Sequence, residues 1–156
     1  MDLILASQSA TRRRILNSAR ISAQFMSPQI DEENITKSLI ADQARPRDIA
    51  DTLAEHKALK ISLKNPNSWV IGCDQILVFE GEIFGKPASS EALKTSLSRL
   101  SGKTHRLITA NVIYKDSKPQ WRHISISHMS MHSVSAAEID AYIEAHWEDV
   151  KHSVGG

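Results

Sequence analysis

The sequence contains little cysteine, carries almost no net charge, and lacks any long apolar run. Cys73 is the only cysteine among 156 residues. No disulfide can therefore form within the chain, which is typical of a protein from a reducing cytosol. The 19 basic and 18 acidic residues leave a formal net charge of +1, which argues against a general nucleic-acid binder with its large basic surplus. Any site for an anion must therefore be local.

The first apolar stretch, residues 3–6, is too short for the core of a signal peptide or for a membrane span. Ser7 and then three arginines interrupt it. No internal repeat or low-complexity segment follows. We therefore expect a cytoplasmic protein that engages neither a membrane nor a nucleic-acid polymer.

Strand-like and helix-like patterns alternate along the chain and predict a single α/β domain over residues 1–156. Strands are expected at residues 2–6, up to Asp74, and again beyond it to a tight turn at Glu80-Gly81, which a return strand follows. Two further strands are expected at 105–115 and 122–132. Residues 26–47 are rich in polar groups and predict a loop with one short helix. Other helices are expected at 10–18, after an N-cap at Ser9 or Ser7, at 48–63, and after Ser89 and Ser135.

The apolar spacing in these helices predicts which faces are buried. Ser135 and Glu138 form the pattern of a capping box at the start of the last helix. The residues expected to face the core are Ile49, Leu53, Ala54, Ala58 and Ile61, then Leu93, Leu97 and Leu100, and finally Ile139, Tyr142, Ile143 and Trp147.

The segment "LASQSATRRRIL" (residues 5–16) combines a strand end, three hydroxyl side chains and three arginines at the start of a helix. Free backbone N–H groups at a helix N-terminus together with guanidinium groups favour binding of a phosphate. The alternative is a capped surface helix whose arginines are merely solvated, and local chemistry alone leaves the two interpretations equal.

Asp74 is flanked by apolar residues on both sides, and such a carboxylate is seldom buried without a partner. At the tip of a buried strand it would suit a magnesium and general-base site. The acidic cluster Asp31-Glu32-Glu33 lies in the predicted loop and is interpreted as solvated. Lys86, between Gly85 and Pro87, is either a rigidly placed cation or an ordinary turn lysine.

Two further motifs are rejected. "SGKTH" (residues 101–105) lacks the earlier glycine of a phosphate-binding Walker loop, because that place is taken by Leu97. Three of the seven histidines, His123, His128 and His132, fall within one strand-like segment, but no HExxH or CxxC pattern accompanies them, so zinc is not expected.

Taken together, the chain resembles the Maf family of nucleoside triphosphate pyrophosphatases, also described as septum-formation proteins. The similarity covers almost the whole chain. It is carried, in order, by "LASQSATRRRIL", "PQIDE", "LAEHKA", "GCDQILVFEGEIFGKP", "LSGKTH" and "AAEIDAYI". Each fragment is weak, but six fragments in the family's order are a specific signal.

The resemblance implies hydrolysis of a nucleoside triphosphate between its α- and β-phosphates, with a divalent metal such as Mg²⁺ or Mn²⁺ as cofactor. It implies a mixed, elongated sheet flanked by helices, with two lobes around a nucleotide cleft. By position, Asp74 matches the family's catalytic aspartate, with Lys86 beside it in the catalytic set, and Glu32 and Asp74 match the metal-binding carboxylates. The residues matching the phosphate-binding set are Ser9, Arg12, Arg13, Lys57 and Lys86.

Thr11 and Gln75 resemble the branch described as 7-methyl-GTP pyrophosphatases and are expected near the base. The other main branch, which prefers dTTP and UTP, carries arginine in place of Thr11. The family's pattern continues beyond "SVGG", so the C-terminal part is expected to be missing. The alternative function is a non-catalytic nucleotide-binding or division-regulating protein, and a homodimer is left open.

Overall fold

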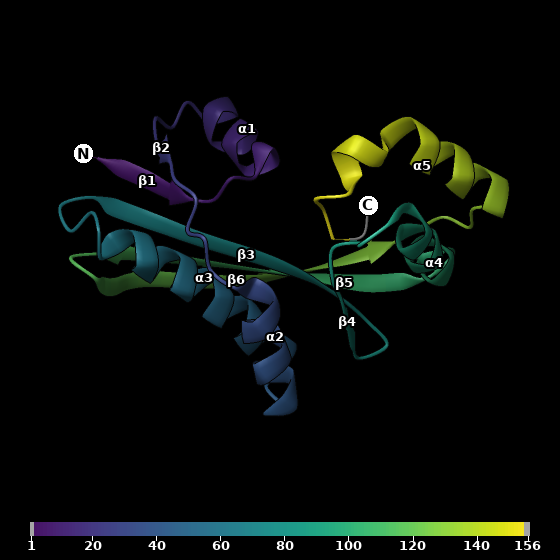
Figure 1. Cartoon of the computed structure of the whole chain (residues 1–156), viewed down its shortest axis with the longest axis horizontal. Coiled ribbons are helices and arrows are strands. Elements are labelled where there is room, and N and C mark those ends of the chain that lie inside the picture. The colour runs from purple at the N-terminus through teal and green to yellow at the C-terminus, as the bar shows by residue number, and fades with distance from the viewer. Residues whose placement is uncertain (1, 155–156) are drawn as a thin grey trace. The chain divides into compact units, whose positions relative to one another are not determined.

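The computed structural model describes residues 2–154 and divides the chain into two compact units. The first unit contains Met1–Asp74 and Thr109–Ser125, and the second contains Gln75–Ile108 and Ile126–Gly156. Five helices alternate with six strands over the described residues, which confirms the predicted α/β class and the mixed sheet flanked by helices (Figure 1).

The sheet has the strand order β2-β1-β3-β5-β6, and β4 pairs with β3 outside this path. β1 pairs in parallel with both β2 and β3, whereas β3 and β4 are antiparallel. The strands are β1 (Leu3–Ala6), β2 (Gln24–Phe25), β3 (Trp69–Phe79), β4 (Glu82–Phe84), β5 (Thr104–Lys115) and β6 (Lys118–Ser130). No helix among residues 2–154 has the length and apolar character needed to cross a membrane.

The first unit contains α1 (Ala10–Ser18), α2 (Glu32–Ala41) and α3 (Pro46–Ser62). Ser9 is the N-cap of α1, because its side chain accepts a hydrogen bond from the Arg12 N–H. α3 begins two residues earlier than expected, with Pro46 in its first turn, where the missing N–H of proline leaves no hydrogen bond unmade. All five apolar residues predicted for the inner face of α3 are buried.

Two expectations about the acidic residues are wrong. Asp74 does not lie at the tip of a strand, because β3 runs on without interruption from Trp69 to Phe79. The acidic cluster does not lie in a loop either: Asp31 is the N-cap of α2, and Glu32 and Glu33 occupy its first turn. Negative side chains are favoured there because the helix dipole is positive at its N-terminus.

The second unit is built on α4 (Ser90–Leu100) and α5 (Ala136–Val150), which pack against each other (Figure 1). The predicted capping box at Ser135 and Glu138 is present, and the predicted inner residues are buried with the exception of two aromatics. Trp147 is only partly buried, and Tyr142 is 39% exposed. The assignment of Tyr142 to the core is therefore wrong; its ring lies against His146 on the same helix instead.

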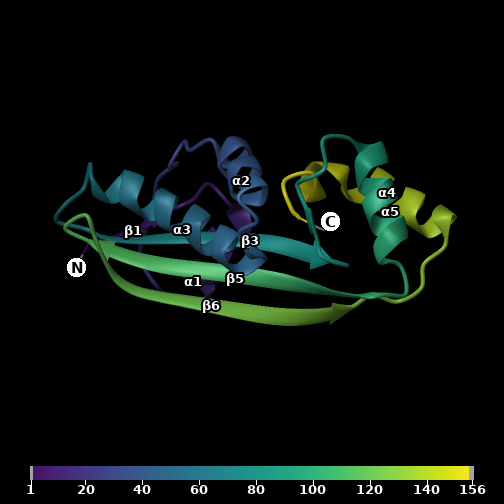
Figure 2. The same ribbon diagram turned by 90° about the horizontal axis from the view of Figure 1, so that it is seen from below.

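Gly72 determines how closely α3 approaches the sheet in the first unit. A Cβ atom at this position would lie 2.0 Å from the Ala54 carbonyl oxygen and 2.8 Å from the Ala58 Cβ. The contact therefore requires a residue without a side chain on β3 and alanines on α3. Because side chains alternate along a strand, Asp74 leaves β3 on the same face as Gly72. The close approach thus brings Asp74 to the side of α3 that carries Lys57, and Figure 2 shows α3 alongside β3 and β5.

Candidate functional site

The centre of the candidate site is a buried ion pair between α3 and β3. The Lys57 ammonium lies 2.6 Å from Oδ1 of Asp74, and only 5% and 7% of these two side chains are exposed. The same ammonium lies 3.0 Å from Oε2 of Glu32 on α2, whose side chain is 41% exposed. Lys57 therefore joins two carboxylates that are 42 residues apart in the chain.

The environment of Asp74 makes its carboxylate a stronger base than an exposed one. Burial raises the pKa of Asp74, since a charged carboxylate loses its hydration there. The ammonium of Lys57 lowers this pKa, the Glu32 carboxylate raises it, and the Arg12 guanidinium lowers it. The cation in contact with Asp74 is Lys57, which the resemblance had assigned to phosphate binding.

Ser7 and Arg12 form the second part of the site, where β1 ends and α1 begins. The buried Ser7 hydroxyl oxygen accepts hydrogen bonds from Nη1 of Arg12 at 3.2 Å and from the Ser9 N–H at 3.1 Å. The Arg12 guanidinium is also one of the charges that lower the pKa of Asp74. The sequence had grouped the Ser7 hydroxyl with the arginines of this segment and had also offered Ser7 as a helix cap, but it did not predict the direct bond from Arg12.

The three consecutive arginines differ in their surroundings. Arg12 is half-buried and turned toward Ser7, whereas the Arg13 guanidinium lies over the Phe25 ring, 4.6 Å from its centre. Arg14 is exposed. A surface hollow along α1 is lined by Gln8, Ala10, Arg13, Arg14, Asn17 and Ser18.

Three further residues were expected in the site: Thr11, Gln75 and Lys86. Thr11 is exposed on α1. Gln75 follows Asp74 on β3 and leaves the strand on the opposite face. Lys86 is exposed and follows β4 in the second unit. For Thr11, Gln75 and Lys86 the assigned contacts with substrate stay predictions.

The donor set fits a divalent cation bound together with phosphate groups. Residues 2–154 contain no group of three or more His, Cys, Asp or Glu side chains that could form an all-protein metal site. Magnesium, however, is usually held by one or two carboxylates plus the phosphates of a substrate. Glu32 and Asp74 meet this requirement, since their oxygens already converge on a common cation, the Lys57 ammonium.

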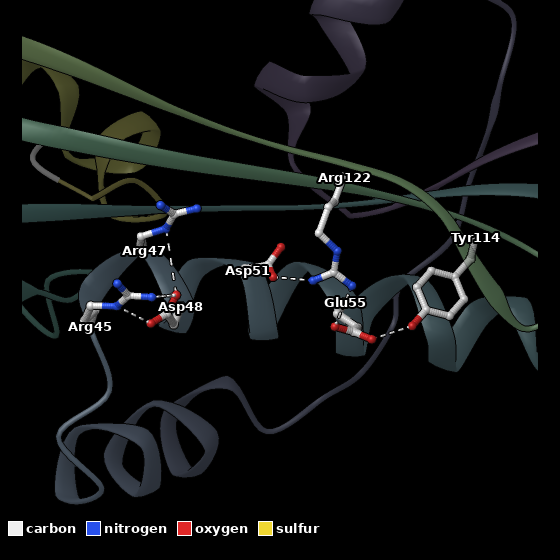
Figure 3. A network of polar contacts seen from close by, with 7 residues as sticks. All are labelled: Arg45, Arg47, Asp48, Asp51, Glu55, Tyr114 and Arg122. Carbon is white, nitrogen blue, oxygen red and sulfur yellow. Dashed lines mark hydrogen bonds and ion pairs between the residues drawn. The ribbon is translucent and has the colours of Figure 1, made fainter.

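A second polar network fixes the outer side of α3 to β5 and β6 (Figure 3). The buried Tyr114 hydroxyl donates a hydrogen bond to Oε1 of Glu55 at 2.6 Å, and Arg122 pairs with both Glu55 and Asp51. Burial and the bond to Glu55 raise the pKa of Tyr114 to about 12. Because Glu55 lies two residues before Lys57, this network helps to hold the helix that carries the site. The network could not be predicted from the sequence, since the bonded partners on α3 and on β5 or β6 are 59 or more residues apart.

The comparisons with known proteins identify the family of the chain. The profile of the family described as "Maf-like protein" matches residues 2–156. A nucleoside triphosphate pyrophosphatase of Jannaschia sp. is 48% identical over 98% of this chain and 77% of its own length. A 7-methyl-GTP pyrophosphatase of Brucella abortus is 45% identical over 92% of this chain and 72% of its own length. Among solved structures, a HAM1 protein from Coxiella burnetii shares the fold with a TM-score of 0.50, at 15% identity over 83% of this chain and 72% of that one. On the profile match and these identities, the chain belongs to the Maf family.

Proposed function

We propose that the protein is a nucleoside triphosphate pyrophosphatase, which uses one water molecule to convert a nucleoside triphosphate into the monophosphate and pyrophosphate. The observation that carries the proposal is the buried Lys57–Asp74 pair, with Glu32 on the same ammonium, in a chain whose relatives have this activity in their names. A buried carboxylate beside cations is a suitable arrangement for hydrolysis of a phosphoanhydride.

Asp74 is the proposed general base. Its raised pKa makes the carboxylate a better proton acceptor, while Lys57 and Arg12 oppose that shift and favour the ionised form. A carboxylate with a raised pKa is suited to remove a proton from water as the water attacks phosphorus. Lys86 is the second proposed catalytic residue, assigned from the sequence as a cation for the charge that develops on the phosphate oxygens.

Glu32 and Asp74 would hold the divalent cation, Mg²⁺ or Mn²⁺. Such a cation, when bound, neutralises negative charge on the phosphate oxygens. The protein's own part is to fix the two carboxylates: Glu32 sits in the first turn of α2, and Asp74 in the middle of β3.

The start of α1 is the proposed triphosphate site. Arg12 is held by Ser7 with its charge near Asp74, and Ser9 closes the first turn of the helix. The first N–H groups of a helix lack partners within the helix and favour an anion, and guanidinium groups add charge-assisted hydrogen bonds. Arg13 completes this set of cations.

The proposed substrate is 7-methyl-GTP, on the strength of Thr11 and Gln75 and of the Brucella relatives that bear this activity in their names. The test compares kcat/KM for pyrophosphate release from 7-methyl-GTP, GTP and dTTP. GTP is the matched control, because it lacks only the methyl group and its charge.

We expect 7-methyl-GTP to exceed both other nucleotides by at least about tenfold, the low end of what recognition of one methyl group provides. Equal values for 7-methyl-GTP and dTTP would refute the substrate assignment. Binding of every nucleotide without turnover would instead favour the non-catalytic alternative.

A further inference from the structure

Lys57 occupies the place between the two carboxylates that are assigned to the metal. Its ammonium lies within hydrogen-bonding distance of Oδ1 of Asp74 (2.6 Å) and of Oε2 of Glu32 (3.0 Å). Lys57 and Asp74 are almost completely buried, so water does not compete effectively for this contact. In this arrangement the lysine already supplies positive charge to both carboxylates.

A divalent cation cannot share this position with the ammonium. Magnesium requires its oxygen ligands at about 2.0–2.1 Å, so it would sit within the space that the ammonium fills. The two cations would also repel each other strongly at such a short separation, because little solvent lies between them. One of them must leave before the other binds.

The lysine side chain is able to leave while its helix stays in place. α3 is fixed to β3 by the close contact at Gly72 and to β5 by the bond between Glu55 and Tyr114. The lysine stem, in contrast, has four flexible carbons and ends in a point charge that readily changes partners. A phosphate oxygen of a bound triphosphate is a suitable new partner for it.

We propose that Lys57 is a built-in competitor of the divalent cation. In the free protein its ammonium holds Glu32 and Asp74 together and blocks metal binding. When a triphosphate binds, the ammonium moves to a phosphate oxygen, and the carboxylates become available to the metal. Metal and nucleotide then bind cooperatively, as linkage requires when both favour the same state. This inference rests on the proposed function.

The test titrates Mn²⁺ into the free protein in mildly alkaline buffer without nucleotide. Electron paramagnetic resonance measures how much of the Mn²⁺ is bound. Lys57→Met should tighten Mn²⁺ binding by at least about tenfold, because the competing charge is gone. Lys60→Met is the matched control: Lys60 lies one turn further along α3, and its ammonium contacts the Gln29 carbonyl oxygen instead of a carboxylate. The control should bind Mn²⁺ as weakly as the parent protein.

Two further variants show where the gained metal is bound. Lys57→Met combined with Asp74→Asn should lose the gain, whereas Lys57→Arg keeps the charge and should leave Mn²⁺ binding weak. If Lys57→Met fails to fold, as far-ultraviolet circular dichroism would show, Lys57→Gln removes the charge and keeps a hydrogen-bond donor. Unchanged or weaker Mn²⁺ binding by a folded, uncharged variant would overturn the proposal.

The outcome is separable from the proposed function. Pyrophosphate release by the parent protein reports on the activity alone, whereas Mn²⁺ binding by the free protein reports on Lys57 alone. A parent protein that releases pyrophosphate, with a Lys57→Met variant that gains no metal affinity, would disprove the competition and leave the enzyme assignment intact.

Discussion

Lys57 and Asp74 are 17 residues apart in the chain, yet their charged atoms lie 2.6 Å from each other in the interior of the first unit. Two buried charges are stable only as partners, since removal of either one leaves the other without compensation. The pair depends on Gly72, two residues before Asp74, because only glycine allows the backbone of β3 to approach α3 this closely.

Gly72→Ala should therefore disturb both the fold and the site. The new Cβ would lie 2.0 Å from the Ala54 carbonyl oxygen, so that α3 must move away from β3. Overpacking of this kind lowers the free energy of unfolding by about 1–3 kcal/mol. Urea denaturation measures the loss. Gly85→Ala is the control, since a Cβ there has no neighbour within 4 Å; equal stability of the two variants would contradict the account.

The Tyr114–Glu55 contact predicts that the folded protein becomes less stable at alkaline pH. An unfolded tyrosine ionises near pH 10.0, whereas the folded pKa of Tyr114 is raised to about 12. The folded state thus favours the neutral phenol. The contribution of the neutral Tyr114 phenol to the free energy of unfolding is fully present below pH 10.0 and is lost as the pH rises toward 12.

The ultraviolet absorbance of ionised tyrosine, followed as the pH rises, tests the raised pKa of Tyr114 directly, because the chain has only two tyrosines. One of them should ionise late in the folded protein, and Tyr114→Phe should remove that late step. A parent protein whose two tyrosines both ionise near pH 10.0 while folded would contradict the buried contact.

Arg13→Ala should weaken triphosphate binding more than it changes the fold. A hydrogen bond between charged groups contributes about 1.5–3 kcal/mol, so calorimetry with a non-hydrolysable triphosphate should show roughly a 10- to 100-fold loss. The contact of Arg13 with the Phe25 ring adds a smaller effect on stability, about 0.5–1 kcal/mol. Arg14→Ala removes the same charge from an exposed neighbour and should change affinity little. Equal affinity of the Arg13 variant and the parent would exclude Arg13 from the site.

Local patterns in the sequence predicted most of the secondary structure. The N-cap at Ser9, the capping box at Ser135 and the apolar face of α3 follow from neighbouring residues, and all three are confirmed. Asp74 was misplaced at a strand end because a polar residue in an apolar run usually marks a boundary. Here β3 continues through it, and a partner on α3 compensates its charge.

The pairing inside the site could not be predicted in the same way. Lys57 was assigned to phosphate alone, because no local rule states which lysine a packed helix will present to a strand. That choice depends on the closeness of α3 and β3 at Gly72, which is a property of tertiary packing. The Tyr114–Glu55 contact was missed for the same reason, since it joins residues 59 positions apart.

Identification of the products formed by the parent protein and by Asp74→Asn tests the central claim most directly. Phosphorus NMR distinguishes a monophosphate and pyrophosphate from a diphosphate and phosphate, and circular dichroism verifies that the variant is folded. The parent should form the monophosphate and pyrophosphate. Asp74→Asn keeps the shape of the side chain but removes its basicity, so turnover should fall by at least about 100-fold. A diphosphate product from the parent, or a folded variant that keeps more than about a tenth of the parental rate, would contradict the assignment of Asp74 as the base of a pyrophosphatase.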